Sequence, residues 1–231
     1  MLSAFFLLFG FYKPIMIVLN LKTYPESIKK ALYFTDVAKE VVDETGVRII
    51  VCPPMLSLHE ASERFSDIFS QHADPVPAGA HTGSIPAEML KAAKVKGSLV
   101  NHSERRVEAG KIKSTVDSLH MHGLESLLCA ASSAEAASIA AYSPTYIAVE
   151  PPELIGSGIS VSKAKPEVVL NSVKAVKDVN QRVTVLCGAG VSDKEDVKKA
   201  LDLGAKGVLL ASAFVKAKDP KAFLSGFASV F

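Results

Sequence analysis

Short apolar runs rich in β-branched residues alternate along this chain with longer stretches of amphipathic pattern. Runs of the first kind predict strands, and stretches in which apolar residues recur with a helical period predict helices. The predicted helices include residues 27–45, 134–141, 166–179 and 194–203. The eight predicted strands are residues 15–19, 48–51, 68–70, 97–100, 126–129, 146–149, 183–186 and 207–210.

This alternation of strands and helices favours a parallel sheet whose strands are joined by crossover helices. Eight strands fit a closed barrel better than an open sheet. The chain has 231 residues, and an α/β barrel takes roughly 200–250 residues. No linker rich in Pro, Gly or Ser divides it. We therefore expect an α/β fold, a single-domain (β/α)8 TIM barrel that spans residues 15–231.

Polar residues at the ends of two predicted helices indicate where those helices begin and end. Ser132 with Glu135, and Ser192 with Glu195, have the spacing of a capping box. Gly204 follows the last apolar position of the helix predicted at 194–203, which is typical of a helix C-cap. These signals predict two helix starts and one helix end.

Two segments do not follow the alternating pattern. Residues 71–86 contain three prolines, two glycines and two histidines and no helical period. A long irregular stretch in a compact domain usually has a function, and this one could pack on another subunit. Residues 1–14 are apolar but too short to span a bilayer, and they lack a clear signal-peptide pattern. We expect them to form an extension outside the fold, with a membrane tether as the less favoured alternative.

The composition is that of an ordinary globular protein, with 48% hydrophobic and 22% charged residues. The net charge of +2 gives no electrostatic reason to expect nucleic acid or a membrane surface as partner. An odd and sparse set of cysteines (Cys52, Cys129 and Cys187) indicates a reducing compartment, so we expect a cytoplasmic protein. Each cysteine lies at or just beyond a predicted strand end, where we expect small apolar fillers near the top of the barrel.

Six polar or charged residues, Asn101-His102-Ser103-Glu104-Arg105-Arg106, follow the apolar run 95–100. Strand ends are where α/β proteins place their chemistry. Backbone N–H groups of a following helix would keep His102 neutral, and a neutral imidazole can donate a hydrogen bond to a carbonyl oxygen. Glu104 and Arg105 could form an ion pair that fixes the loop. A lone histidine is more often structural, and an exposed ion pair carries little energy, so the motif needs partners elsewhere.

Two further strand ends carry a charged group. Asn20-Leu21-Lys22 follows the first strand, and a lysine at a barrel rim can bind an anionic substrate and stabilise developing negative charge. Glu150 ends the strand at 146–149 and precedes a segment with prolines at one end and glycines at the other. That arrangement suits a general base under a lid. Taken singly, a surface lysine and a turn carboxylate are the simpler interpretations.

The last two strand ends suit a phosphate site. Residues 187–191 read Cys-Gly-Ala-Gly-Val after strand seven, and Ala211-Ser212 follows strand eight. Barrels often bind phosphate with the loops after strands seven and eight and with a short helix N-terminus. A dinucleotide fingerprint is set aside, because Asp193 stands where the third glycine would be.

Metal chemistry is not indicated by the pattern. His120 and His122 are two apart on a predicted helix and do not share a face. The cysteines are spread over three strand ends rather than paired at metal-ligand spacing. We expect no metal and no cofactor.

Each motif is weak alone, but their order along the chain is specific. Asn-x-Lys follows strand one, His-Ser-Glu-Arg-Arg follows strand four, Glu-Pro opens the loop after strand six, and Gly-x-Gly follows strand seven. In these motifs the sequence resembles the triosephosphate isomerase family, from about residue 15 to the C-terminus. The motif at 101–106, the segment Leu-Ile-Gly-Ser-Gly at 154–158 and the short chain resemble its archaeal branch.

The resemblance implies interconversion of D-glyceraldehyde 3-phosphate and dihydroxyacetone phosphate through an enediolate. Glu150 would be the base, and His102, in its neutral form, would be the electrophile that polarises the substrate carbonyl. Asn20 and Lys22 would bind the substrate and stabilise the enediolate, with Leu21 between them in the same segment. A neutral histidine beside a carboxylate base is what the resemblance to this family implies. No cofactor is implied, because proton transfer between adjacent carbons needs none.

The resemblance also implies supporting groups. Glu104 would anchor Lys22, Arg105 would support the loop, and Ser103 would hold the base when the lid is open. Backbone N–H groups near Ile155, Gly190, Ala211 and Ser212 would bind the phosphate. The lid that excludes water would comprise Pro151, Pro152, Glu153, Leu154, Ile155, Gly156, Ser157 and Gly158.

Assembly and departures from the family follow from the same comparison. Residues 71–86 match an intersubunit loop in which Thr82 would approach the neighbour's active site, so we expect a homo-oligomer, at least a dimer and by the archaeal resemblance a tetramer.

Pro152-Glu153 stands where bacterial and eukaryotic relatives carry a tryptophan hinge, and the loop after strand seven lacks their tyrosine and serine. Residues 1–14 have no counterpart.

Two alternatives remain open at this stage. Another phosphate-binding barrel enzyme, such as an epimerase or a biosynthetic isomerase, would often use paired aspartates or metal-bound histidines, and neither pattern is present. A non-catalytic barrel that binds phosphometabolites would be expected to lose Lys22, His102 or Glu150 first. Fold alone does not decide between an enzyme and a binding protein.

Overall fold

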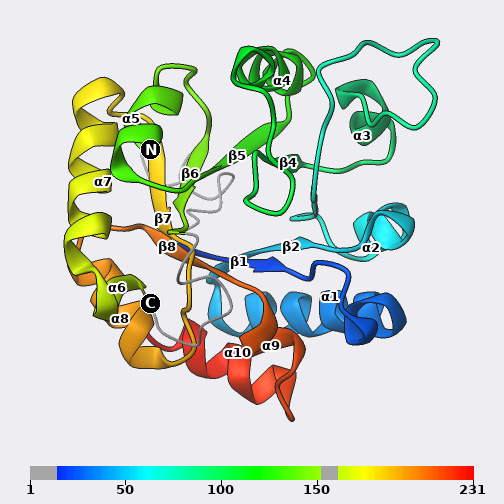
Figure 1. Ribbon diagram of the computed structural model, residues 1–231. Coiled ribbons are helices and arrows are strands. Elements are labelled where there is room, and N and C mark those ends of the chain that lie inside the picture. The colour runs from blue at the N-terminus through cyan, green and yellow to red at the C-terminus, as the bar shows by residue number, and fades with distance from the viewer. Residues whose placement is uncertain (1–14, 152–160) are drawn as a thin grey trace, which may run out of the picture.

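The computed structural model describes residues 15–151 and 161–231. Its strands form one parallel eight-stranded sheet in the order β2-β1-β8-β7-β6-β5-β4-β3. A parallel bridge between Val51 and Ile68 connects β2 to the chain entering β3, so the sheet closes into a barrel (Figure 1). The predicted (β/α)8 barrel is therefore confirmed. The strands are β1 (Met16–Asn20), β2 (Arg48–Cys52), β3 (Phe69–Ser70), β4 (Gly97–Val100), β5 (Glu125–Ala130), β6 (Tyr146–Val149), β7 (Thr184–Cys187) and β8 (Gly207–Leu210).

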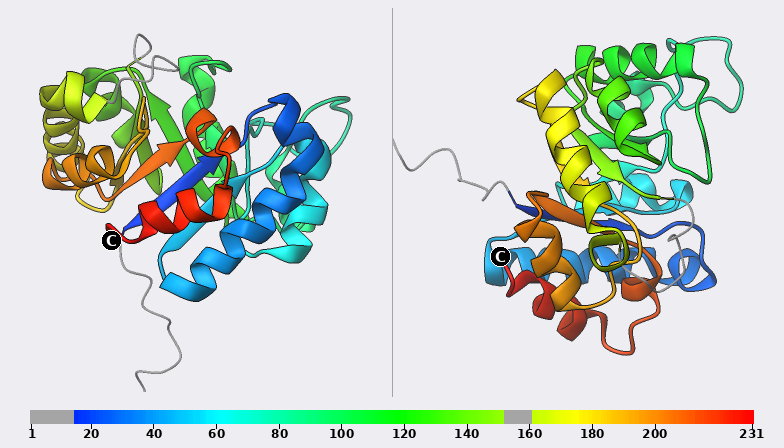
Figure 2. Two further views of the ribbon diagram at one scale, coloured as in Figure 1. Left: turned by 90° about the horizontal axis from the view of Figure 1, so that it is seen from below. Right: turned by 60° about the vertical axis from the view of Figure 1, so that its left-hand side comes forward.

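Helices lie between successive strands and surround the barrel, as the views from three directions show (Figures 1 and 2). Within residues 15–151 and 161–231, no helix is long and apolar enough to cross a membrane. The segment 71–86, predicted to be irregular, forms neither helix nor strand. The helices are α1 (Pro25–Thr45), η1 (Met55–Ser57), α2 (Leu58–Arg64), α3 (Ala87–Ala92), α4 (Ala109–Met121), α5 (Ser133–Ala140), α6 (Val161–Ala164), α7 (Pro166–Val179), α8 (Lys194–Asp202), α9 (Ser212–Val215) and α10 (Pro220–Ala228).

Alternation along the strands divides the apolar residues into two cores. Every second strand residue points into the barrel, which is filled by a cluster that includes Val18, Ile50, Leu127 and Leu186. The intervening residues face the helices and form the larger outer core. The interior of the barrel is thus filled by side chains, and the space for chemistry lies at the carboxyl ends of the strands.

The three cysteines are buried and free, but they do not share one location. Cys52 and Cys129 lie inside the barrel, as expected for fillers. Cys187 belongs to the outer core instead, because successive strand residues point to opposite faces and its neighbour Leu186 points into the barrel. Burial raises the pKa of the Cys187 thiol to about 12, so this side chain is an inert filler.

A polar cluster occupies the lower end of the barrel, the end at which the strands begin. The Arg48 guanidinium, at the start of β2, donates hydrogen bonds to Asp67 Oδ1 (2.7 Å), to Glu125 Oε1 (2.9 Å) and to the Tyr146 hydroxyl. Asp67 is fully buried. Burial and the neighbouring carboxylate of Glu125 raise the pKa of Tyr146. A buried charge of this kind is tolerated only because it is paired and hydrogen-bonded.

The helix ends confirm one predicted cap and correct another. The Ser132 hydroxyl accepts a hydrogen bond from the Glu135 N–H and caps α5, as predicted. The capping box expected at Ser192 is wrong by one residue. Asp193 caps α8 by accepting a hydrogen bond from the Asp196 N–H, and the Asp196 carboxylate accepts one from the Asp193 N–H. The Asp196 carboxylate also accepts hydrogen bonds from the N–H and the hydroxyl of Ser192. The helix dipole favours a negative charge at the N-terminus of a helix, and Asp193 supplies that charge whereas a serine cap would not.

The predicted helix end at Gly204 lies one residue beyond the C-cap, Leu203. Gly204 has φ 95°, the left-handed region that favours glycine after a helix. The extension predicted at residues 1–14 lies outside the described residues.

Candidate active site

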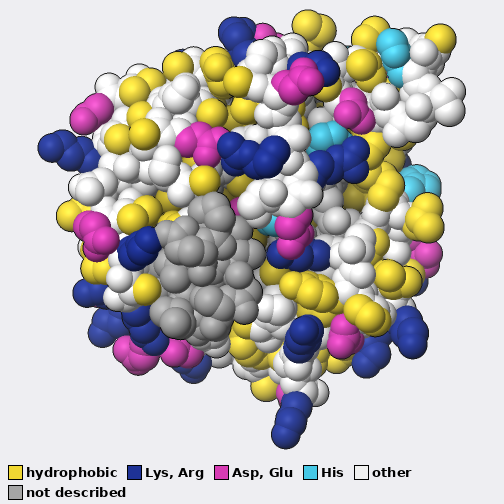
Figure 3. All heavy atoms as spheres, viewed as in Figure 1, with side chains coloured by type: hydrophobic (Ala, Val, Ile, Leu, Met, Phe, Trp, Pro, Cys, Tyr) yellow, Lys and Arg dark blue, Asp and Glu magenta, His cyan; other side chains and the backbone are white. Residues whose placement is uncertain are grey.

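The motif residues lie at one end of the barrel, where all parallel strands point their carboxyl ends. Asn20 ends β1, His102 lies two residues after β4, and Glu150 directly follows β6. Figure 3 looks onto this face of the molecule and shows acidic, basic and histidine side chains close together near its centre. Segments far apart in sequence therefore converge on one site.

Lys22 is held in an unusual backbone conformation. Its φ of 48° is in the left-handed region, which costs a non-glycine residue about 1–3 kcal/mol. The Asn20 side chain stabilises it by accepting a hydrogen bond from the Lys22 N–H at 3.0 Å. The Gln71 amide donates to the Lys22 carbonyl at 3.0 Å and also to the Cys52 carbonyl. Three strand ends thus fix the direction of one lysine side chain.

The Lys22 ammonium is paired with the carboxylate of Glu104. Nζ lies 2.7 Å from Glu104 Oε1, and the two side chains are 12% and 57% exposed. The expected ion pair between Glu104 and Arg105 is not formed in the described part of the chain, because Glu104 turns toward Lys22 instead. Arg105 is exposed, and its N–H donates to the His102 carbonyl.

The hydrogen bonds of His102 define its tautomer. The side chain is buried, and its Nδ1 accepts a hydrogen bond from the Glu104 N–H at 3.2 Å. A ring nitrogen that accepts cannot carry a proton, so the imidazole is neutral with its proton on Nε2. We expected this N–H to come from a helix. It belongs instead to a turn, since α4 begins only at Ala109.

Asn101 fixes the loop that presents His102. Its φ of 63° is left-handed, which asparagine tolerates better than most residues. Its amide donates to the Cys129 carbonyl at 3.1 Å and to Glu135 Oε1 at 3.2 Å, and its oxygen accepts from the Val107 N–H. The orientation of His102 therefore depends on contacts with β5 and α5.

Glu150 is a buried carboxylate that faces His102. It is 3% exposed, and its Oε2 lies 3.6 Å from His102 Nε2. That oxygen has no hydrogen-bond partner among the described residues. Burial raises the pKa of Glu150, and the hydrogen bond from the Cys129 thiol and the charge of Lys22 partly offset the rise. A poorly solvated carboxylate with a raised pKa has the properties of a general base.

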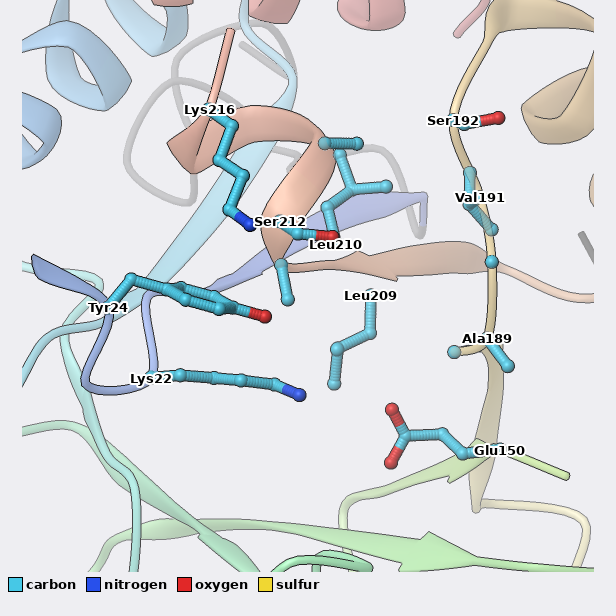
Figure 4. A pocket seen from close by; sticks show the side chains of 14 residues that line it. Lys22, Tyr24, Glu150, Ala189, Val191, Ser192, Leu209, Leu210, Ser212 and Lys216 are labelled. Atoms are coloured by element: carbon cyan, nitrogen blue, oxygen red, sulfur yellow. The ribbon is translucent and has the colours of Figure 1, made fainter. Parts of the chain in front are cut away.

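Two cavities meet at Lys22. One of about 310 Å³ contains Glu150 and the loops after β7 and β8 (Figure 4). The other, of about 270 Å³, is lined by Asn20, His102 and Glu104. A small molecule that spans both would touch the lysine, the imidazole and the carboxylate together.

The predicted phosphate residues line the first cavity. Gly190 has φ 68°, a left-handed conformation that glycine adopts without strain. Ala211 precedes α9, and Ser212 is its first residue. Backbone N–H groups at such a helix start favour anions.

Some predicted residues do not come to the site or cannot be placed there. Leu21 is fully buried in the outer core and lines neither cavity. Ser103 is half-buried, and no hydrogen bond joins its hydroxyl to Glu150 among the described residues. Pro151 is buried after Glu150. The remaining lid residues, Pro152, Glu153, Leu154, Ile155, Gly156, Ser157 and Gly158, lie outside the described residues.

The structure brings in residues that sequence reasoning missed. Tyr24 and Lys216 line the first cavity, Gln71 binds the Lys22 loop, and Cys129 contacts Glu150. Gly188 also approaches Glu150 closely. Tyr24 and Cys129 could have been found in the sequence, because both lie near strand ends. Their contacts with the other site residues form only when the barrel closes. In the two described ranges, no group of three His, Cys, Asp or Glu could hold a metal ion.

Comparison with known proteins gives a consistent result. The family model described as "Triosephosphate isomerase" matches residues 15–229. The chain is 52% identical over 208 residues to a triosephosphate isomerase of Methanothermus fervidus, covering 89% of this chain and 94% of the relative. It is 49% identical to one of Methanocaldococcus jannaschii, covering 88% and 94%, and 48% identical to one of Archaeoglobus fulgidus, covering 89% and 93%. With these matches over nearly its whole length, the chain belongs to the triosephosphate isomerase family, in its archaeal form.

Proposed function

We propose that this protein interconverts D-glyceraldehyde 3-phosphate and dihydroxyacetone phosphate by proton transfer through an enediolate. The observation that carries the proposal is the pair formed by Glu150 and His102, a buried carboxylate and a neutral imidazole 3.6 Å apart beside Lys22. Family membership supplies the substrate, since the relatives are triosephosphate isomerases. The two cavities that meet at Lys22 suit a small substrate.

Glu150 acts as the base in this proposal. Its carboxylate removes a proton from the carbon beside the substrate carbonyl, and the carboxylic acid then returns the proton to the neighbouring carbon. The burial that raises its pKa also makes it a stronger base once ionised. One carbon of the substrate is oxidised and its neighbour is reduced by the same amount, so proton transfers balance the reaction without an external oxidant or reductant.

His102 acts as the electrophile. Its Nε2–H points to the side of the cavity where Glu150 lies, because Nδ1 is occupied by the Glu104 N–H. The proton on Nε2 can bond to the substrate carbonyl and then move between the two enediolate oxygens. A neutral histidine acts in this role in the triosephosphate isomerase family.

Lys22 and Asn20 stabilise the negative charge of the enediolate. The backbone of Lys22 is held by its contacts to Asn20 and Gln71, and its ammonium is held by the ion pair with Glu104. A preorganised charge needs no rearrangement when the intermediate forms. We assign Ser103 and Arg105 to support of the same loop and give Leu21 a packing role.

The phosphate group is placed at the loops after β7 and β8. N–H groups at Gly190, Ala211 and Ser212 are proposed to bind it, together with Ile155 from the lid. Closure of the lid, residues 151–158, would exclude water from the enediolate and prevent loss of phosphate. Gly190 and Ser212 line the cavity that holds Glu150, which supports this placement.

A coupled assay with glyceraldehyde 3-phosphate on purified protein tests the function. We expect turnover, and we expect His102→Gln to reduce kcat by roughly 10²–10⁴. His120→Gln is the matched control, because His120 lies in α4 and contacts Ser126 away from the site. A protein that binds the substrate without turning it over would support the non-catalytic alternative instead.

Assembly and location complete the proposal. We propose a homo-oligomer, at least a dimer and, following the archaeal resemblance, a tetramer, in which residues 71–86 carry Thr82 toward a neighbour's site. Exposed Leu56, Met55 and Met89 would then be covered, which supports an interface near this segment. Light scattering of the purified protein tests the stoichiometry. The cytoplasmic location proposed from the free cysteines is tested by cell fractionation.

A further inference from the structure

We propose that Lys216 is an additional substrate-binding residue, whose ammonium contacts the phosphate group of the triose phosphate. Lys216 follows α9 directly and lines the cavity that holds Glu150, Lys22 and Ser212. The inference rests on the proposed function, because it assigns a ligand group to the same site. It adds a charged side chain to a phosphate site that otherwise consists of backbone N–H groups.

Binding of a phosphate group in this cavity requires a second positively charged side chain. Lys22 and Lys216 are the basic residues that line it among those described, and Glu150 is the acidic one. Lys22 is already paired with Glu104 at 2.7 Å. A phosphate monoester brings a charge of about −1.5 to −2 at neutral pH. Placing that charge beside Glu150 with a single, already neutralised lysine would be unfavourable.

Lys216 is available for this role. No carboxylate lies within salt-bridge distance of its ammonium in the described part of the chain, whereas Lys163 and Lys221 each pair with two carboxylates. Its ammonium lies over the Tyr24 ring, 5.2 Å from the ring centroid. A cation held on an aromatic face keeps most of its capacity to bind an anion, because the ring carries no net charge.

The local geometry directs the ammonium to the phosphate loops. The Lys216 N–H donates to the Ser212 carbonyl at 3.0 Å, so the two residues lie one turn apart on the same side of α9. Figure 4 shows the side chain running back toward Ser212 and the Tyr24 ring lying between Lys216 and Lys22. Tyr24 itself is half-buried and packs on the outer core. The aromatic ring therefore spaces the two lysines on one wall of the cavity.

Variants at Lys216 test the assignment directly. Lys216→Met removes the charge but keeps the length, and Lys216→Arg keeps the charge. Lys218→Met is the matched control, because Lys218 is equally basic and two residues away but lines only the outer groove beside α1. Each protein is assayed with glyceraldehyde 3-phosphate, with inorganic phosphate as competitive inhibitor, and with D-glyceraldehyde, which lacks the phosphate.

We expect Lys216→Met to weaken inhibition by inorganic phosphate about tenfold and to raise KM for glyceraldehyde 3-phosphate similarly. Its kcat/KM for D-glyceraldehyde should equal that of the wild type, because the missing charge acts on the phosphate alone. Lys216→Arg should restore most of the phosphate affinity, and Lys218→Met should match the wild type.

Two results would overturn the assignment. One is inhibition by phosphate that is unchanged in Lys216→Met, and the other is an equal loss with both glyceraldehyde and its phosphate, which would show a general structural effect. Failure of the proposed function is distinguishable, since the wild-type protein would then show no isomerase activity. Circular dichroism and Tm of each variant establish that it is folded.

Discussion

Gly188 lies so close to Glu150 that any side chain at position 188 would displace the carboxylate. A Cβ placed on Gly188 would be 2.5 Å from Glu150 Cγ and 3.1 Å from Oε1. Atoms do not approach so closely in proteins, so the glycine is required by the position of the proposed base. The first glycine of the loop after β7 is thus explained by packing against Glu150 rather than by phosphate binding.

Gly188→Ala should therefore lower kcat by about 10²-fold, the effect of moving a catalytic group by about 1 Å. The methyl group would push Glu150 from its place opposite His102. Steady-state kinetics measure the effect. Gly110→Ala is the control, because the space around Gly110 is open and the residue lies in α4. Unchanged kcat in Gly188→Ala would show that Glu150 need not occupy this position.

The pH dependence of activity should reflect the buried state of Glu150. Burial raises its pKa above that of an ordinary glutamate, about 4.3. The base must be ionised to act, so activity is present above the raised pKa and is lost as pH falls through it. We expect the acid limb of kcat/KM to lie above about pH 4.3. A limb at or below the ordinary value would contradict the assignment of Glu150.

Loss of the Lys22 anchor should impair catalysis more than folding. Glu104→Gln removes the charge that holds the Lys22 ammonium at 2.7 Å. We expect kcat/KM to fall roughly tenfold, while Tm changes little because Glu104 is mostly exposed. Glu108→Gln is the control, since Glu108 is an exposed partner of Lys111. A large loss of Tm without loss of kcat/KM would show that the pair is structural only.

Disruption of the polar cluster at the lower end of the barrel should reduce stability more than catalysis. Arg48→Met leaves Asp67 and Glu125 without their guanidinium partner, and removing one partner of a buried pair costs about 3–5 kcal/mol. For a chain of this size that lowers Tm by roughly 6–20 °C. Turnover of the folded protein should persist, because the cluster lies at the opposite end from Glu150.

Arg64→Met provides the comparison for that experiment. Arg64 also pairs with two carboxylates, Asp36 and Glu60, but its side chain is exposed, so Tm should hardly change. Equal Tm values for the two arginine variants would refute the proposed importance of burial. Thermal unfolding followed by circular dichroism measures both.

The sequence was sufficient to predict most of the fold. Strand β4 and strand β8 begin and end where the pattern predicted, because short apolar runs between amphipathic helices have few other interpretations. The capping box at Ser192 was wrong because Asp193, one residue later, is an equally good cap and adds a negative charge at the helix N-terminus. Helix ends depend on such local competition, which spacing alone does not resolve.

The candidate site was predictable only in part. His102, Glu150 and Lys22 stand at strand ends, so a parallel barrel brings them together without further information. The contacts of Gly188 and Lys216 could not be predicted, because they depend on side-chain packing across neighbouring loops. For the same reason Leu21, which lies between two site residues in sequence, packs into the outer core instead.

The most direct test of the central claim is the turnover of Glu150→Asp with glyceraldehyde 3-phosphate. The substitution keeps the carboxylate but withdraws it by one methylene from the cavity shared with Lys22. We predict that kcat falls by at least about 10²-fold, while KM stays close to the wild-type value. Turnover like that of the wild type would contradict the role of Glu150 as the base.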